Sequence, residues 1–193
     1  EVKMKNEALQ IAKEADVIVC AMGETADMSG ECASRTNLEM PDVQQELLAE
    51  LAKMGKPVVL LNFAGRPTVL SWENEHIPAI MNVWFGGSEV GDALCDVIFG
   101  DKVPSGKLTT SMPKTTGQEP LYYNHQNTGR PVPDDNQKFA KFASNCMDVS
   151  NGPLYPFGYG LSYTTFEYGD LKLSSHQVNM DDWKITATIN VKN

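Results

Sequence analysis

The chain has 193 residues, of which 41% are hydrophobic and 21% are charged, and its formal net charge is −9. These values suit a globular protein with one domain and part of a second, and no apolar run reaches the roughly 20 residues of a membrane helix. An acidic chain without a basic cluster also lacks the means to neutralise phosphates. We therefore expect neither a nucleic-acid partner nor a membrane partner.

The first residues of the chain do not indicate a signal peptide, and its cysteines and histidines do not indicate a metal site. No apolar core follows the first six residues, so they are not a signal peptide, and without an initial Met we expect a piece of a longer protein. The four cysteines and three histidines show no metal-ligand spacing, so we expect no metal and no cofactor. Cys20 and Cys95 fall in apolar segments, and both are expected to be buried.

The first half of the chain alternates helical and extended patterns. Helices are predicted at 7–15, 42–54, 71–75 and 88–99, and apolar runs predict strands at 17–22, 58–63 and 79–84. Continuous apolarity is typical of parallel strands that are covered on both faces. We therefore predict an α/β fold with a doubly wound, mostly parallel sheet, and because three strands are few, we expect part of this sheet to precede residue 1.

The second half loses this periodicity. From 101 to 161, prolines and aromatic residues alternate irregularly, which predicts a belt that packs over the domain or against a neighbour. From 184 to 192, polar and apolar residues alternate as in a half-buried antiparallel strand, and Leu171 and Leu173 begin a similar one. We read these as the first strands of a β-sandwich, which divides the chain into domains at 1–161 and 162–193.

A long polar loop at 23–41 follows the first predicted strand. Open α/β sheets place their ligand sites at the carboxyl ends of parallel strands, so this loop is the candidate site. It carries Glu24, Asp27 and Glu31, with Arg35 close behind. Plainer interpretations exist for each residue, because exposed carboxylates are common. Glu24 and Asp27 fit a surface or loop-supporting role, and Arg35 fits a structural partner of a carboxylate.

Two other kinds of site receive little support from this loop. Cys32 would need a base such as His76 or His125 and a positive environment to act as a nucleophile, but its surroundings are acidic. Gly23 and Gly30 lack the Gly-x-Gly-x-x-Gly spacing of a nucleotide-binding loop.

Five stretches of the sequence resemble one known family. They are Gly-Lys-Pro-Val-Val-Leu at 55–60, Asn-Phe-Ala-Gly-Arg-Pro at 62–67, Gly-Asp-Lys-Val-Pro-Ser-Gly-Lys-Leu at 100–108, Tyr-Tyr-Asn-His-Gln-Asn-Thr-Gly-Arg-Pro at 122–131 and Leu-Tyr-Pro-Phe-Gly-Tyr-Gly-Leu-Ser-Tyr-Thr-Thr-Phe at 154–166. Over nearly its whole length the chain is similar to the carboxyl-terminal α/β domain of glycoside hydrolase family three, the β-glucosidase and β-xylosidase family, followed by the start of a fibronectin-type-III-like domain.

The resemblance implies part of a retaining, β-glucosidase-like enzyme that hydrolyses terminal β-linked sugars of a β-glycoside or oligosaccharide, in the periplasm or outside the cell. The family's nucleophilic Asp lies in an amino-terminal barrel domain, so the isolated chain is expected to be inactive. The family's acid/base is a Glu followed, after three residues, by Arg or Asp. Glu31 to Arg35 fits that pattern, which makes Glu31 the candidate acid/base. Met28, Ser29 and Arg35 are candidate substrate-binding residues.

Two alternatives stay open. The family's N-acetylglucosaminidase branch resembles this architecture but takes its acid/base from a barrel loop. Alternatively, the chain is a non-catalytic interaction or scaffold domain that self-associates through an exposed domain face or strand edge.

A retaining glycosidase needs a nucleophilic carboxylate and a carboxylic acid about 5–5.5 Å apart. Because no sugar site closes over the loop in this chain, we expect Glu31 to be solvated.

Overall fold

The computed structural model describes residues 2–127, 129–132, 134, 136, 139–181 and 183–193. Thr128 and Pro133, which belong to the predicted belt, lie outside these residues. The main domain consists, in chain order, of α1 (Val2–Glu14), β1 (Ile18–Gly23), α2 (Asp42–Ala52), β2 (Val58–Phe63), α3 (Ser71–His76), β3 (Ala79–Asn82) and α4 (Val90–Ile98). The predicted alternation of helices and strands is confirmed. None of the described helices combines the length and apolarity needed to cross a membrane.

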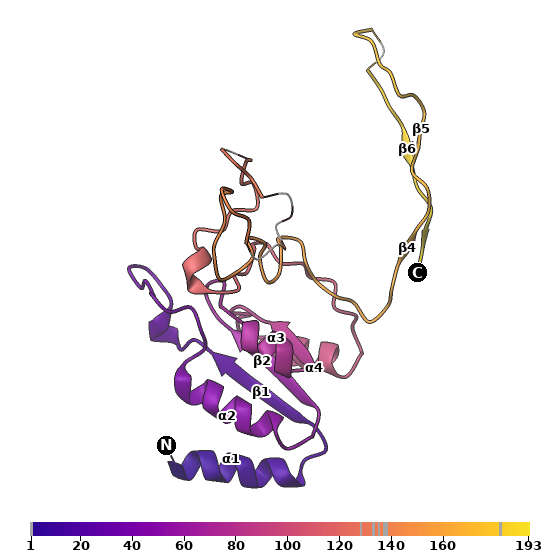
Figure 1. The fold of residues 1–193 in the computed structure, drawn as a ribbon. Helices are drawn as coiled ribbons and strands as arrows, with labels where there is room; N and C mark the ends of the chain where they lie inside the picture. Colours follow the sequence, from indigo (N-terminus) through magenta and orange to yellow (C-terminus); the bar gives the residue numbers. More distant parts are fainter. Residues whose placement is uncertain (1, 128, 133, 135, 137–138, 182) are drawn as a thin grey trace.

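The three strands form a parallel sheet in the order β1-β2-β3. Ile18 pairs with Val58, and Val59 pairs with Ala79, so the strands run in one direction and end at a common edge. Helices α1 and α2 lie side by side below β1 in Figure 1. The loops that leave the carboxyl edge are therefore brought together by the sheet itself.

The hydrophobic core lies between the sheet and the helices α1 and α2. Its buried members are Ala12, Ile18, Cys20, Met40, Leu48, Leu51, Val58, Leu60 and Ile77. Each fully buried aliphatic side chain contributes about 1.5–3 kcal/mol relative to an exposed one. The buried Leu48 and Leu51 confirm the apolar stripe that the sequence predicts for α2. The core thus fixes the strand ends from which the candidate loop departs.

Two burial predictions for this domain are wrong. The strand β1 is covered on one face only, since its side chains alternate between buried and exposed and Val19 is 48% exposed. The reason is that no described element packs on the second face of β1. Cys20 is buried as predicted, but Cys95 is exposed, because α4 buries none of its residues against the described chain.

The belt at 101–161 is irregular, as predicted, and is tied to the domain at α3. Met112 is buried, and its amide donates to Tyr155 O at 2.8 Å, which pairs the two sides of the belt. Tyr155 Oη donates to Asn74 Oδ1 of α3 at 2.7 Å. Not all aromatic residues of the belt are covered by the described chain, since Tyr122, Tyr123 and Phe142 are exposed, although the Tyr123 ring contacts that of Phe157 with centroids 4.6 Å apart.

The chain ends in a long antiparallel ladder. β4 (Glu167–Tyr168) pairs with β7 (Val191–Lys192), and β5 (Lys172–Leu173) pairs with β6 (Ala187–Thr188). The predicted antiparallel pairing of this segment is confirmed. The prediction that its apolar side chains are buried on one face is wrong, since Ile185, Ile189 and Val191 are all exposed. Figure 1 shows the reason: the ladder extends away from the α/β domain, and no described second sheet covers its apolar side.

Candidate active site

Three loops converge at the carboxyl edge of the sheet. They follow β1, β2 and β3 and include Ser29, Gly65 and Phe85, respectively. A Cβ atom on Gly65 would lie 1.8 Å from Ser29 Oγ and 3.0 Å from Phe85 Cε2. Only glycine allows the other two loops to approach this closely. The candidate loop is thus packed against its neighbours at the edge where open α/β sheets bind ligands.

Glu31 occupies the middle of a tight turn in this loop. The Ala33 amide donates to Gly30 O at 3.2 Å and closes the four-residue turn, in which Cys32 has a φ of 62°. A positive φ at the third residue is the feature of a type II turn, where glycine is the usual occupant. Glu31 is exposed, in agreement with the expected solvation. Among the described residues its carboxylate has no hydrogen-bond or ion-pair partner.

Glu24 lies at the base of the same loop and is buried, with its side chain only 1% exposed. Its Oε1 accepts a hydrogen bond from Arg35 Nη1 at 3.0 Å and forms an ion pair with Arg66 Nε at 2.9 Å. Its Oε2 accepts a hydrogen bond from the Gly65 amide at 3.0 Å. A surface role for Glu24 is therefore wrong, because its partners surround the carboxylate; the loop-supporting role matches these contacts.

The charge state of Glu24 follows from these contacts. Burial by itself would raise the pKa of this carboxyl, but the hydrogen bonds from Arg35 and Gly65 and the charge of Arg66 outweigh it and hold the pKa below the ordinary value. Glu24 is therefore ionised at neutral pH. Since a general acid must hold a proton there, Glu24 is unsuited to that role.

The two arginines extend from Glu24 to the backbone of the loop. Arg66 Nη2 donates to Met28 O at 2.6 Å and to Ala33 O at 2.9 Å, and Arg35 Nη2 donates to Glu39 O at 3.1 Å. Sequence reasoning missed the role of Arg66. Its place directly after the second predicted strand, at the edge where the first loop begins, was the available signal.

The ends of the loop are fixed as well. At its start, the Gln44 side chain accepts from Gly23 N at 2.7 Å and donates to Gly23 O at 3.0 Å, which joins α2 to the end of β1. Near its exit, Leu38 O accepts from Val69 N at 2.9 Å, and Leu38 N donates to Thr116 Oγ1 at 3.2 Å. The turn that carries Glu31 therefore stands on an anchored frame.

The remaining candidate residues lie around this frame. Met28 and Ser29 are half-buried, and Asp27 is exposed in the short 3-10 helix η1 (Ala26–Met28). Arg35 directs its guanidinium to Glu24 and Glu39 O. These positions place all of them within the loop that carries Glu31.

A thiol-based site and a metal site gain no support from the described residues. Cys32 is exposed, and the His76 ring stacks on Trp72 with centroids 4.5 Å apart. No described contact joins Cys32 to His76 or His125. Within the described part of the chain, no group of three or more His, Cys, Asp or Glu residues is placed to hold a metal ion.

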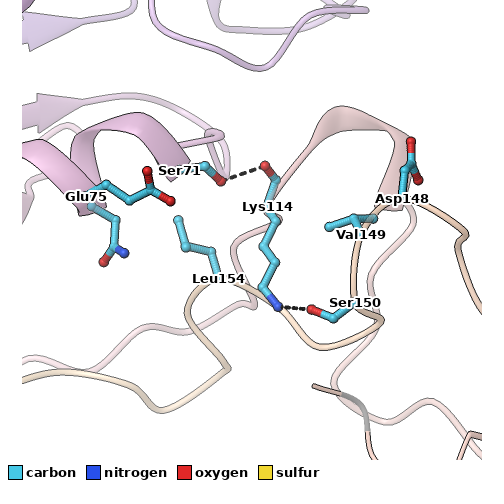
Figure 2. Close-up of a pocket in the computed structure, with 8 residues that line it drawn as sticks. Ser71, Glu75, Lys114, Asp148, Val149, Ser150 and Leu154 are labelled. Carbon is cyan, nitrogen blue, oxygen red and sulfur yellow. Dashed lines mark hydrogen bonds between the residues drawn. The ribbon is translucent and has the colours of Figure 1, made fainter. Parts of the chain in front are cut away.

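A separate pocket of about 380 Å³ lies between α3 and the belt (Figure 2). Ser71 Oγ donates to Lys114 O at 2.7 Å, and the Lys114 ammonium contacts Ser150 Oγ, so polar groups at its wall are engaged with one another. None of the candidate loop residues lines this pocket. The loop, with its exposed carboxylate, is therefore the better candidate for catalysis.

Comparison with known proteins agrees with this fold. The periplasmic β-glucosidase of Salmonella typhimurium is 49% identical over 98% of the chain, and a β-xylosidase of Formosa agariphila is 38% identical over 96%. A crystal structure of a Listeria innocua β-glucosidase in complex with isofagomine, 40% identical, superimposes with a TM-score of 0.82 over 91% of the chain. The chain spans 24% of the length of each of these proteins. The model of the glycosyl hydrolase family 3 C-terminal domain matches residues 2–163, and the chain therefore belongs to this family.

Proposed function

We propose that the chain is part of a retaining β-glycosidase in which Glu31 is the general acid/base. The observation that carries this proposal is the contrast within one loop: Glu31 is exposed and unpartnered among the described residues, while Glu24 is buried and ionised beside two arginines. Unlike the Glu24 carboxylate, the exposed carboxyl group of Glu31 can reach a substrate placed over the sheet edge.

In this mechanism the Glu31 carboxylic acid donates its proton to the oxygen of the leaving group as the glycosidic bond breaks. A carboxylate from the part of the enzyme outside residues 1–193 attacks the anomeric carbon and forms a covalent glycosyl-enzyme. Glu31, now ionised, removes a proton from water, which displaces the nucleophile and restores the anomeric configuration. A nucleophile supplied from elsewhere makes the isolated chain inactive.

The substrate class, the substrate-binding residues, the location and the domain boundary belong to the same proposal. The names of the relatives support a terminal β-linked glucose or xylose as the substrate class. Met28, Ser29 and Arg35 are proposed to contact the substrate, because they flank the Glu31 turn. The periplasmic relative supports a periplasmic or secreted location. The division between the α/β domain at 1–161 and a fibronectin-type-III-like domain from 162 onward is also part of this proposal.

The test uses the intact enzyme and the substitution Glu31→Ala. On an aryl β-glucoside with a good leaving group, we expect deglycosylation to become slow, because no base activates water. Azide needs no base, so it should restore turnover and yield a β-glycosyl azide. Asp27→Ala is the matched control, since Asp27 is an exposed carboxylate of the same loop, and it should leave the rate unchanged.

Unchanged activity of Glu31→Ala would overturn the assignment. The acid/base would then lie outside this loop, as in the N-acetylglucosaminidase branch, or the chain would serve as a scaffold. The observation that favours a scaffold is the exposed edge strand β1, with Val17 and Val19 open to a second copy. A sedimentation profile that stays monomeric at high concentration would exclude this self-association.

A further inference from the structure

Glu24 has a connection to Glu31 that burial alone does not explain. The contacts of its carboxylate lead through Arg66 to the backbone on both sides of the Glu31 turn. Met28 lies two residues before the turn and Ala33 is its last residue, and a single nitrogen, Arg66 Nη2, binds the carbonyl oxygens of both at 2.6 Å and 2.9 Å. One guanidinium group therefore binds the backbone both just before the turn and at its last residue.

The guanidinium itself is oriented by Glu24. Arg66 Nε lies 2.9 Å from Glu24 Oε1. The carboxylate therefore sets the orientation of the guanidinium group, whose Nη2 binds the loop backbone. The second arginine repeats the arrangement farther along, from Glu24 Oε1 through Arg35 to Glu39 O. The Gly65 amide holds Oε2 and ties the network to the end of β2.

On this geometry we infer that Glu24 is a positioning residue for Glu31, acting through Arg66 and Arg35 on the loop backbone. The inference rests on the proposed acid/base role of Glu31 and names the group that holds it in place. Glu24 touches neither the substrate nor the reacting atoms. Its ionised carboxylate keeps the two guanidinium groups in the orientation that fixes the turn.

The chemistry predicts which substrates should respond. A general acid works only when its proton lies within hydrogen-bond reach of the leaving oxygen, and a misplacement of about 1 Å costs about 100-fold in rate. A poor leaving group needs that proton, whereas a very good one departs as an anion without it. Loss of positioning must therefore appear as a steeper dependence of the rate on the leaving group.

The experiment compares phenyl β-glucoside with 2,4-dinitrophenyl β-glucoside in the intact enzyme carrying Glu24→Gln, which keeps the side-chain size and removes the charge. We expect kcat/KM to fall about 100-fold on the phenyl substrate and to stay near the wild-type value on the dinitrophenyl substrate. A merely structural role would lower the amount of active enzyme and reduce both values by the same factor.

A second single variant, Arg66→Lys, keeps the test available if Glu24→Gln does not fold. Arg66→Lys keeps a positive charge beside Glu24 but lacks the fork that joins Nε to Nη2, so it should show the same selective loss. The double variant should lose no more than the worse single variant, because both act in one network. Glu73→Gln is the matched control: Glu73 is also a buried glutamate, but no described hydrogen bond joins it to the loop, and both substrates should behave as in the wild type.

The outcomes separate this inference from the function on which it rests. If Glu31→Ala lowers kcat/KM by the same factor on both substrates, the acid/base assignment fails, whatever Glu24 does. If Glu31→Ala shows the selective loss while Glu24→Gln and Arg66→Lys show equal loss on both substrates, or none, the positioning role fails and the acid/base assignment stands.

Discussion

The loop after β1 and the helix α3 each bury a glutamate, and the two are opposite in charge behaviour. Glu24 in the loop is 7% exposed and Glu73 in α3 is 0% exposed, so burial does not distinguish them. Glu24 has two arginines and a backbone amide as partners. Glu73 has a long hydrogen bond of 3.5 Å from Gln45 Nε2 to its Oε1, while its buried Oε2 has no partner among the described residues.

The difference teaches that partners decide the ionisation of a buried carboxylate once burial is complete. Burial raises the pKa of Glu73 above its ordinary value, and its weak partners do not compensate. The same burial acts on Glu24, but its arginines and the Gly65 amide reverse the direction. The partners of Glu24 thus favour its ionised form, whereas burial shifts the pKa of Glu73 in the opposite direction.

The largest expected effect comes from removing the carboxylate of Glu24. Glu24→Ala leaves two arginines without their partner and should lower the local free energy of opening of the loop by about 3 kcal/mol, the low end of the range for breaking a buried ion pair. We choose the low end because the side chains of Arg35 and Arg66 are 19% and 20% exposed. Hydrogen exchange of the Met28 and Ala33 amides in the intact protein measures this change.

The amides of α2 provide the internal reference for that experiment, since the core holds this helix independently of Glu24. Unchanged protection at Ala33 would show that Gly65 and the loop ends hold the turn without the arginines, and the contrast between the two glutamates would lose its structural meaning.

A smaller effect of opposite sign is expected from Glu73→Gln. At neutral pH the substitution removes a carboxyl whose ionisation is disfavoured by burial, so the local stability of α3 should rise by about 1 kcal/mol. Exchange of the Ile77 amide, which donates to Glu73 O at 2.8 Å, reports on this helix. A loss of protection instead would mean that the carboxylate has a favourable role that the contacts of the described residues do not reveal.

The smallest effect concerns pH in the wild-type protein. The lowered pKa of Glu24 adds stability above its ordinary value of 4.5, and this contribution is lost as the pH falls below 4.5 towards the folded-state pKa. The raised pKa of Glu73 has the opposite sign: stability falls as the pH rises above 4.5, because the unfolded state ionises first.

Exchange protection, corrected for intrinsic rates, should therefore decrease in the loop and increase in α3 on acidification from neutral pH. Parallel changes in the two regions would contradict the opposite signs.

Much of the fold could be predicted from local sequence patterns. The strand at 58–63 was predicted with the bounds that β2 has, and the helix predicted at 42–54 ends two residues earlier, at Ala52. The strand predicted at 79–84 ends at Asn82, where the positive φ of Trp84 interrupts the extended chain. Periodicity failed where burial depends on a distant partner, as it does for the exposed face of β1 and for Ile189 in the terminal ladder.

The sequence by itself determined the order of elements and the position of the long polar loop, because these depend on residue types and their spacing, and its resemblance to a known family singled out Glu31 in that loop. Only the tertiary structure decided which carboxylate in that loop is buried and which is exposed. Arg66 is 42 residues from Glu24 along the chain, and only the parallel pairing of β1 with β2 places its guanidinium against that carboxylate. A contact of this kind leaves no local periodicity, since it arises from two loops that the sheet brings to the same edge.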